Sequence, residues 1–409
     1  MQDRQLYEQI LGLQSPWHVA EVKLCLDRNE VKVYLKHAPD ATWSCAECGR
    51  ECPVHDHHGP RTWRHLDTCQ LQTTLIATVP RTRCPEHGVR LAQIPWAEPY
   101  GRFTLLFERM VLAWLQDASQ SAVASRLNLS WDEVHGIMQR AVERGLKRRQ
   151  VADVRHVGID EKSFRRGHRY ATLVNDLDTG HVLYVGEDRR ETSLDGFWAM
   201  LTDEQLEAIE GVAIDMSAPY ENAIRAHVPE SQDKIVYDKF HVVMHLSEAV
   251  DKVRRQENKQ LRAAGDERLV GTKYDWLRNP DNFEQDDWQA FQQLRHSALK
   301  TARAWAIKEQ VMVLWDYTYE KSATNFFDRW YNWAIRSRLE PVKKVARMMK
   351  KRLPNILTYL KHRITNAMSE GINSKIQWIK YTARGFRNFE NFRTAIYFHC
   401  GGLDLSHAH

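Results

Sequence analysis

Apolar and polar positions change their periodicity several times along the chain, and each change predicts a different kind of element. Residues 62–67 and 70–83 are typical of strands, whereas residues 103–149 lack proline and place apolar side chains at helical spacing. From residue 154 to residue 238, three short apolar runs alternate with a turn and helix-like stretches. Residues 242–360 are helical in pattern. We therefore predict an α/β plus α fold that contains a mixed sheet and a large helical segment.

The segment before residue 150 has the outline of a helix-turn-helix. Residues 120–127 predict a short helix, Asn128 lies in the turn, and Ser130 with Glu133 forms a capping box that starts a second helix. A helix-turn-helix places its second helix in a groove of DNA. The residues predicted to face that groove are His135, Gln139, Arg140 and Arg144. The cluster Lys147, Arg148 and Arg149 favours phosphate contact. An ordinary helical hairpin is the alternative.

The cysteines add a predicted metal site near the amino terminus. Seven cysteines are present, and an odd number argues against a disulfide framework. Cys45 and Cys48 form one C-x-x-C-G knuckle, and Cys84 and His87 form a second knuckle that is also followed by glycine. Two such knuckles suit one tetrahedral zinc ion within a zinc ribbon. The alternative is a set of buried free thiols. Possible substitute ligands, which fit a polar loop better, are Cys52, His55, His57 and His58.

Charge and hydropathy exclude several classes of protein. Lys and Arg number 58 against 53 Asp and Glu, so the net charge of +5 does not by itself indicate a polyanion partner. No apolar run is long enough to predict a membrane span, and the first residues lack the pattern of a secretory signal. We therefore expect a folded cytoplasmic protein of two to four domains.

Two aspartates follow apolar runs in the predicted sheet. One run ends in Asp160, and a second ends in Asp215, with Pro219 just inside a helix start, so we expect each aspartate at the carboxyl end of a strand. Functional groups of open α/β sheets gather at the carboxyl ends of strands. Two carboxylates there repel each other unless cations lie between them, and hard oxygen ligands suit Mg²⁺ or Mn²⁺. Two such ions about 4 Å apart serve phosphodiester cleavage. The alternative is that both aspartates only cap helices.

A third acidic residue lies on a predicted helix close to the carboxyl terminus. Met368, Ile372, Ile376 and Ile379 form its apolar stripe, and Glu370 lies on another face with Asn373 and Gln377. We expect the stripe to pack on the sheet while Glu370 points at the aspartates. The cations predicted to contact DNA around it are Lys375, Lys380, Arg384 and Arg387. The alternative is a surface glutamate that offsets its basic neighbours.

The helical segment before that glutamate is rich in tryptophan and contains one strongly basic run. We expect most of the tryptophans to anchor the core rather than stack on bases. Residues 343–352 contain six basic residues and no acid, which fits either a solvated helix face or a phosphate contact. The residues proposed for that contact are Lys343, Lys344, Lys350, Lys351 and Arg352.

The ordered set of motifs resembles the bacterial DDE transposases of the ISL3 insertion-sequence family. The resemblance runs through CAECG and RTRCPEHG, the helix-turn-helix, GIDEKSFRRGHRYATLV, AIDMSAPYENAI, YDKFHVV and SEGINSKIQWIKYTARGFRNFENF. It implies a ribonuclease-H-like domain that an all-α insertion interrupts between the second Asp and the Glu. It also implies that Asp160, Asp215 and Glu370 bind two Mg²⁺ or Mn²⁺ ions. Asp238 and His241 match a further segment of the family, where we expect a helix cap or a structural hydrogen bond.

The resemblance also predicts how the chain is divided and what it does. The predicted parts are a zinc-binding domain (1–100), a helix-turn-helix (101–150), the first catalytic part (151–245), an all-helical insertion (246–355) and the second catalytic part (356–409). We expect one structural Zn²⁺ and a nucleoid-associated enzyme that binds terminal inverted repeats of double-stranded DNA as a homodimer and then cleaves and transfers strands. The alternatives are a non-catalytic DNA-binding regulator and a ribonuclease-H-like nuclease without strand transfer.

Overall fold

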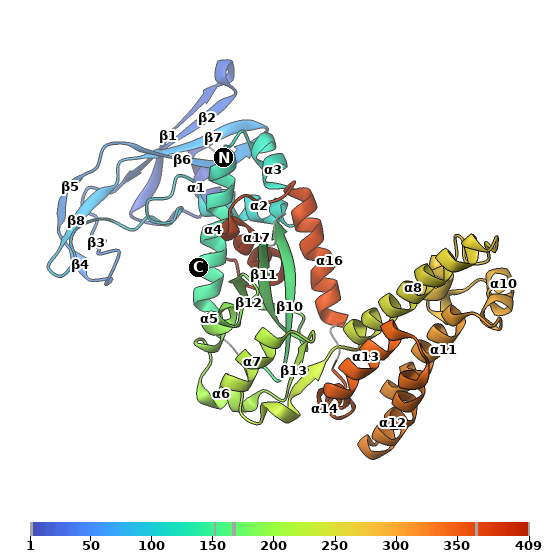
Figure 1. The fold of residues 1–409 in the computed structure, drawn as a ribbon. Coiled ribbons are helices and arrows are strands. Elements are labelled where there is room, and N and C mark those ends of the chain that lie inside the picture. The colour runs from blue at the N-terminus through green and yellow to red at the C-terminus, as the bar shows by residue number, and fades with distance from the viewer. Residues whose placement is uncertain (1–2, 151–152, 166–168, 365–366, 408–409) are drawn as a thin grey trace. The chain divides into compact units, whose positions relative to one another are not determined.

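The chain forms two compact units in a computed structural model that describes residues 3–150, 153–165, 169–364 and 367–407. The first unit comprises Met1–Arg148 together with Asp404–His409, and the second comprises Arg149–Leu403 (Figure 1). The last residues of the chain therefore belong to the amino-terminal unit. No helix in the described ranges combines the length and the apolar character that crossing a membrane requires.

A four-stranded sheet forms the core of the first unit. Alternating apolar positions turn one face of each strand inward, as in β2, where Val31, Val33 and Leu35 are buried and their neighbours are not. Trp63, at 0% exposure, is the largest fully buried side chain of that core. In sheet order the strands are β1 (Trp17–Cys25), β2 (Glu30–His37), β7 (Leu71–Ala77) and β6 (Arg61–Thr68), and α1 (Asp3–Leu11) precedes them.

Two smaller sheets carry the cysteine knuckles. They are formed by β3 (Trp43–Ser44) with β4 (Glu51–Cys52), and by β5 (Val54–His57) with β8 (Pro80–Cys84) and β9 (Gly88–Leu91). Each predicted knuckle therefore lies in or beside a tight connection between short antiparallel strands.

The helix-turn-helix predicted from the sequence is confirmed in its local geometry. Its helices are α2 (Leu105–Leu115), α3 (Gln120–Leu127) and α4 (Trp131–Arg148). Asn128 ends α3 in the left-handed region, with φ at 53°. The Ser130 hydroxyl accepts from the Glu133 amide at 3.2 Å while the Glu133 carboxylate accepts from the Ser130 amide at 2.9 Å, which completes the capping box. Val134 and Ile137 are fully buried on the inner face of α4.

A five-stranded mixed sheet forms the base of the second unit. Its order is β12 (Val182–Glu187), β11 (Arg169–Asp176), β10 (His156–Arg165), β13 (Gly211–Ile214) and β14 (Ile235–Tyr237). The first three strands are antiparallel and the last three are parallel. Gly180, at φ 73°, lies in the hairpin turn that the sequence predicts. This is the mixed sheet expected of the catalytic domain.

Helices cover the sheet and form the insertion (Figure 1). Those around the sheet are α5 (Asp195–Trp198), α6 (Asp203–Ala208), α7 (Ala218–His227), α16 (Ala367–Thr382) and α17 (Phe389–Cys400). The insertion contains α8 (Lys239–Ala263), α9 (Lys273–Leu277), α10 (Gln285–Arg295), α11 (Lys300–Met312), α12 (Glu320–Arg336), α13 (Glu340–Lys351), α14 (Leu353–Leu357) and α15 (Tyr359–His362).

The insertion shares a continuous apolar core with the sheet. Trp276, Trp305, Trp315 and Trp330 are buried in it, which confirms that most of the tryptophans are core anchors, whereas Trp333 is 39% exposed. The buried Glu257 of α8 accepts hydrogen bonds from the backbone of Lys300 and Thr301, so it satisfies free amides at the start of α11.

Candidate functional site

Local backbone geometry shapes each of the two cysteine knuckles. The Gly49 amide donates to the Cys45 carbonyl at 2.9 Å, and Gly49 adopts φ 71° in that turn. The second knuckle connects β8 to β9, where Cys84 pairs with Gly88 and Gly88 adopts φ 69°. Residues other than glycine rarely adopt such positive φ angles, which explains why each knuckle ends in glycine.

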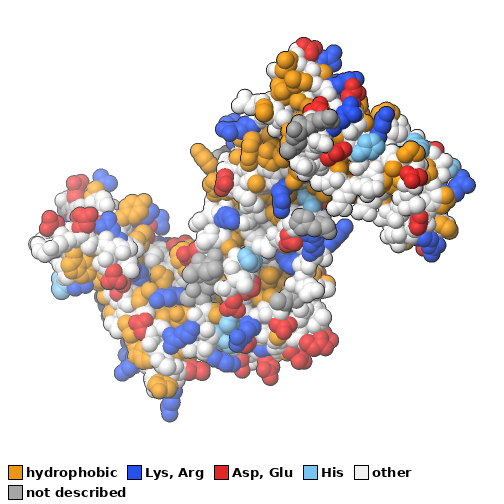
Figure 2. Space-filling view, turned by 180° about the vertical axis from the view of Figure 1, so that it is seen from behind, with side chains coloured by type: hydrophobic (Ala, Val, Ile, Leu, Met, Phe, Trp, Pro, Cys, Tyr) orange, Lys and Arg blue, Asp and Glu red, His pale blue; other side chains and the backbone are white. Residues whose placement is uncertain are grey.

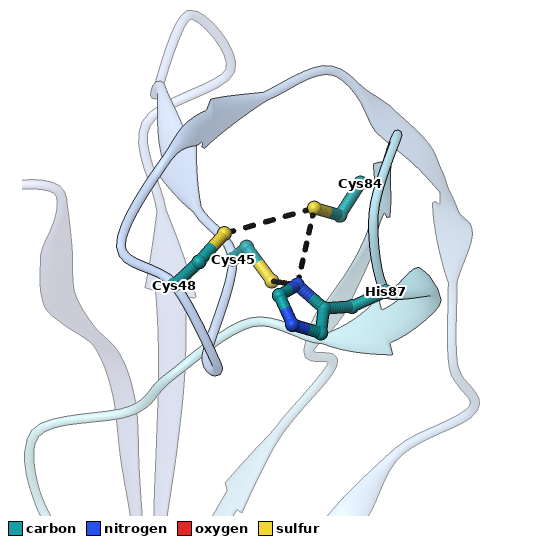
Figure 3. A group of neighbouring side chains, drawn as sticks. All are labelled: Cys45, Cys48, Cys84 and His87. Carbon is teal, nitrogen blue, oxygen red and sulfur yellow. Dashed lines mark hydrogen bonds between the residues drawn. The ribbon is translucent and has the colours of Figure 1, made fainter.

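The four ligand atoms of these knuckles lie at the corners of a tetrahedron (Figure 3). Cys48 Sγ lies 3.7 Å from Cys84 Sγ, and His87 Nδ1 lies 3.5 Å from Cys84 Sγ and 3.8 Å from Cys45 Sγ. A zinc ion with Zn–S bonds of about 2.3 Å would hold its sulfur ligands about 3.8 Å apart. The observed separations therefore fit a zinc ion. In the described ranges, this is the single group of three or more His, Cys, Asp or Glu residues whose ligand atoms lie within 4.8 Å of one another.

The substitute zinc ligands considered from the sequence have other partners. Cys52 is buried beside the cluster, but its thiol donates to the Arg50 carbonyl at 3.3 Å. His55 contacts Arg83, His57 stacks on His37, and His58 contacts the Gly59 carbonyl. The three histidines thus contact residues outside the tetrahedron, whereas Cys52 also interacts with Cys84.

Strand register places Asp160 and Asp215 next to each other. The parallel pairing of β10 with β13 ends at Ile159 and Ile214, and the two aspartates follow directly. The expectation that Asp160 ends its strand is wrong, because β10 continues to Arg165 by antiparallel pairing with β11. Asp215 does follow the end of β13. One aspartate is therefore held inside a strand and the other begins a connecting loop.

The acidic residues at this point affect one another electrostatically. Burial raises the pKa of Asp215, and Asp160 raises it further, whereas His241, His245 and the Ser217 amide favour the charged form. Burial also raises the pKa of Glu161; Arg189 opposes that shift, while Asp215 and Asp160 add to it. The site is thus a group of carboxylates whose charges the chain compensates only in part. Glu161, which no sequence pattern singled out, belongs to this group because the charges of Asp215 and Asp160 both act on its carboxylate.

Hydrogen bonds fasten α16 alongside β10 (Figure 1). Asn373 Nδ2 donates to Asp160 Oδ2 at 2.7 Å, and Asn175 Nδ2 donates to the Ser369 hydroxyl at 2.7 Å. Lys380 Nζ donates to the Ser163 carbonyl at 2.7 Å. The exposed Glu370 lies between Ser369 and Asn373, one turn before Asn373, a spacing that places Cβ atoms about 5–6 Å apart. The turn that carries Glu370 is therefore adjacent to Asp160.

The apolar stripe of α16 packs inward as predicted. Ile372, Ile376 and Ile379 are buried. The side chain of Met368, the first member of the predicted stripe, lies outside the described residues. At the other side of the site, the Asp238 carboxylate accepts from the Phe240 amide at 3.2 Å and caps α8, which confirms the expected helix cap.

Several cations predicted to contact DNA have partners within their own unit. Arg140 pairs with the buried Glu108, and Arg144 donates to the carbonyls of Leu405 and Ser406. Arg148 contacts Asp404 and Ser406, and Arg149 donates to the carbonyls of Val182 and Leu183. His135 stacks on Trp131, Gln139 donates to Glu143, and Lys147 is exposed. DNA contact by these residues stays a prediction.

The basic run of the insertion is also partly paired. Lys343 contacts Glu340 and Lys350 contacts Asp328, whereas Lys344 and Lys351 are exposed and Arg352 is half-buried. Figure 2 shows Lys and Arg side chains interspersed with Asp and Glu on the face that it draws. In α16 Lys375 donates to the His399 carbonyl, and beyond that helix Arg384 and Arg387 are exposed.

Comparisons with known proteins cover every part of the chain that carries these features. A model of the ISL3-type DDE family, described as a transposase, matches residues 157–396. The helix-turn-helix domain of transposase family ISL3 matches residues 92–142, and the zinc-finger of transposase IS204/IS1001/IS1096/IS1165 matches residues 41–87.

Two curated relatives are similar over most of their length. The transposase for insertion sequence element IS1001 of Bordetella parapertussis is 30% identical over 400 residues, which are 96% of this chain and 97% of the relative. The transposase for insertion sequence element IS1557 of Mycobacterium tuberculosis is 29% identical over 370 residues, 84% of this chain and 82% of the relative.

Proposed function

Because the chain belongs to the ISL3 family of DDE transposases, enzymes that cleave DNA and transfer its strands, we propose that Asp160, Asp215 and Glu370 are its catalytic acids. The hydrogen bond from Asn373 to Asp160 carries this assignment, because it holds the turn of α16 that bears Glu370 against the strand that bears Asp160. The parallel register of β10 and β13 supplies the second aspartate.

We propose that these three carboxylates hold two Mg²⁺ or Mn²⁺ ions. Carboxylate oxygens are the ligands such ions prefer, and the partly buried, mutually repelling acids fit a site that cations complete. Bound divalent ions would stabilise the attacking and leaving oxygens of a phosphodiester. Asp160 and Asp215 would hold the ions from adjacent strands, Glu370 would hold them from α16, and Asn373 would orient Asp160. One Zn²⁺ held by Cys45, Cys48, Cys84 and His87 fits the zinc ribbon as a structural ion.

We further propose that the first unit recognises the terminal inverted repeats of the element. The zinc ribbon and the helix-turn-helix support this role, because both are matched by domains of the same transposase family. Within α4, the exposed Gln139 and Lys147 and the half-buried His135 remain the most accessible of the predicted contacts. Since two element ends must be cut together, we propose a homodimer on DNA.

The decisive experiment incubates the full-length protein with duplexes of its own element ends, with Mg²⁺ or with chelator, and maps nicks and joined products. We expect Asp160→Asn, Asp215→Asn and Glu370→Gln each to lower cleavage at least a thousandfold while end binding persists. Asp203→Asn, an exposed aspartate in the first turn of α6, is the matched control. Cleavage by any triad variant at the parental rate would remove the assignment. Light scattering of the same complex measures how many protomers it contains. A single protomer bound to paired ends would exclude the dimer.

A further inference from the structure

The helix α16 has four sides, and three of them are occupied by the protein itself. Ile372, Ile376 and Ile379 face the core. Asn373 and Lys380 contact β10. On the side toward α17, Lys375 donates to the His399 carbonyl and Trp378 packs edge-on against the His399 ring at 5.4 Å.

The fourth side is an exposed stripe that begins at Glu370. Ser374, Gln377 and Tyr381 follow Glu370 by four, seven and eleven residues, and all four residues are exposed. At about 100° per residue, these spacings place the three side chains within about 40° of the direction of Glu370. Glu370, Ser374, Gln377 and Tyr381 are called the outer stripe of α16 below. The outer stripe spans about 16 Å, since an α-helix rises about 1.5 Å per residue.

Tyr381 is the most unusual member of the outer stripe. Its side chain is 83% exposed, the highest value among the large apolar side chains that the structure describes as exposed. It lies on a regular helix that three other sides anchor, so the ring is presented on a rigid support. Single exposed apolar side chains are common on protein surfaces. Tyr381 differs from such residues because it lies in line with Glu370 and has charged surroundings.

The charge around the outer stripe favours a polyanion. No acidic residue occurs from residue 371 to residue 389, whereas the same segment contains Lys375, Lys380, Arg384 and Arg387. The two lysines donate to backbone carbonyls, which are neutral, so their positive charges remain uncompensated by those contacts. Arg384 and Arg387 are exposed just beyond Tyr381. Exposed aromatic rings flanked by cations are what proteins use to hold a nucleic-acid strand.

We propose that the outer stripe of α16 is the surface along which the DNA strand next to the cleaved phosphate lies, with the ring of Tyr381 stacked on one unpaired base. This inference rests on the proposed catalytic role of Glu370. Gln377 lies between the acid and the ring, where its amide can hydrogen-bond to the strand, and Arg384 and Arg387 hold the phosphates beyond. About 16 Å corresponds to about five nucleotides of a strand, at about 3.4 Å per nucleotide.

The test uses the full-length protein on its element ends with Mg²⁺. Tyr381→Ala should lower strand cleavage about tenfold, whereas Tyr381→Phe, which keeps the ring, should remain within twofold of the parent. Tyr319→Ala removes another tyrosine, 75% exposed in the insertion, and is the matched control with no expected effect. Unchanged melting temperatures of all three variants would confirm that the fold is intact.

An abasic scan distinguishes stacking from a general loss of binding. Single abasic sites are placed at each of about seven nucleotides on either side of the cleavage point, beyond the reach of about five nucleotides inferred above. With the parent protein, one position should lower cleavage about tenfold, and with Tyr381→Ala that position should have no further effect.

Cleavage by Tyr381→Ala within twofold of the parent, or equal sensitivity of both proteins to every abasic site, would overturn the inference. The proposed catalytic role of Asp160, Asp215 and Glu370 would then still stand, provided that cleavage by the parent depends on them. Conversely, cleavage that is independent of the three acids would overturn the proposed function, whatever Tyr381 contributes.

Discussion

The zinc cluster and the acidic site are both sets of side chains that we propose as metal ligands, yet only the first is closed. In the zinc cluster, four ligand atoms lie within 4.8 Å of one another. At the acidic site, Asp160 accepts hydrogen bonds from the Asn373 side chain and the Glu161 backbone amide, and Glu370 is exposed one turn before Asn373 in α16. The ligand atoms of the zinc cluster therefore surround one position, whereas the carboxylates of the acidic site do not.

The physical reason lies in the charge of the ligands. In the zinc cluster, a hydrogen bond from the His87 backbone lowers the pKa of Cys84 to about 6, so a thiolate forms there readily, and contacts to sulfur hold the group in place. Three carboxylates cannot approach in the same way, because each raises the free energy of ionising the others. The raised pKa of Asp215 and of Glu161 records this repulsion on top of their burial. A structural ion thus suits the closed site, and exchangeable ions that arrive with DNA suit the open one.

Loss of the zinc ion should produce the largest effect on the fold. Cys84→Ser removes a ligand that is 2% exposed and contacts both Cys48 and His87. Structural zinc contributes on the order of 10 kcal/mol to small zinc domains, so we expect the two small sheets that carry the knuckles to unfold. Metal analysis of the purified protein measures the bound zinc, and limited proteolysis between residues 41 and 91 measures the unfolding of the two sheets.

The exposed Cys69, which lies outside the cluster, gives the matched control Cys69→Ser. If Cys84→Ser retained one zinc ion per chain and resisted protease like the parent, the zinc cluster would not be a metal site. The zinc cluster could then no longer be contrasted with the acidic site as a closed metal site.

Local patterns were sufficient to predict the closed site but not all of the open one. The knuckles and the capping box at Ser130 depend on neighbours within four residues, so spacing alone reveals them. The end of β10 depends on its pairing with β11, which is why Asp160 was placed wrongly at a strand end. The bond between Asn373 and Asp160 joins residues 213 positions apart. Periodicity placed Asn373 beside Glu370 without showing what it would contact.

The carboxyl-terminal residues were the least predictable from sequence. They follow α17, and the predicted second catalytic part (356–409) includes them; in the structure, Asp404–His409 belong to the same compact unit as the helix-turn-helix. The contact between Glu108 and His407 spans 299 positions and involves a single side chain at each end. No periodic pattern marks such a contact, because it depends on the whole fold between them.

Glu108 is a buried carboxylate whose partners are side chains of the protein itself. It is 1% exposed, and it contacts both Arg140 and His407 Nε2, the latter at 3.0 Å. Burial alone would raise the pKa of Glu108, but the hydrogen bond from His407 and the charge of Arg140 outweigh burial and hold it below the ordinary value of 4.5. The chain itself therefore outweighs the burial of Glu108, whereas it compensates the burial and repulsion at Asp215 and Glu161 only in part.

Removing His407 should have the second-largest effect on stability. We expect His407→Ala to destabilise the first unit by about 1–3 kcal/mol, because a buried charged acceptor loses one of its donors. Since the folded pKa of Glu108 is lowered, its contribution to stability is complete above pH 4.5 and is lost as the pH falls through the folded pKa. The variant should lose part of that acid dependence. Thermal unfolding between pH 3 and pH 7 measures both effects.

His18→Ala, at an exposed histidine of β1, is the matched control. Equal unfolding temperatures of His407→Ala and the parent at pH 7 would show that Arg140 alone compensates Glu108. Glu108 would then differ from the acidic site only through its contact with Arg140.

The smallest effect expected is the one that bears most directly on the open site. Asn373 Nδ2 donates to Asp160, and Asn373 Oδ1 is buried with no hydrogen-bond partner among the described residues. Asn373→Ala should lower cleavage several-fold by releasing Asp160, and Asn373→Asp should lower it more, because another carboxylate beside Asp160 increases the repulsion. In both variants the Mg²⁺ concentration for half-maximal cleavage should change along with the rate. Thr382→Ala, at the last residue of α16 and outside both the outer stripe and the contact with Asp160, is the matched control for a general disturbance of α16. Parental rate and Mg²⁺ dependence in Asn373→Asp would mean that the amide does not position Asp160, and that the openness of the acidic site comes from carboxylate repulsion alone.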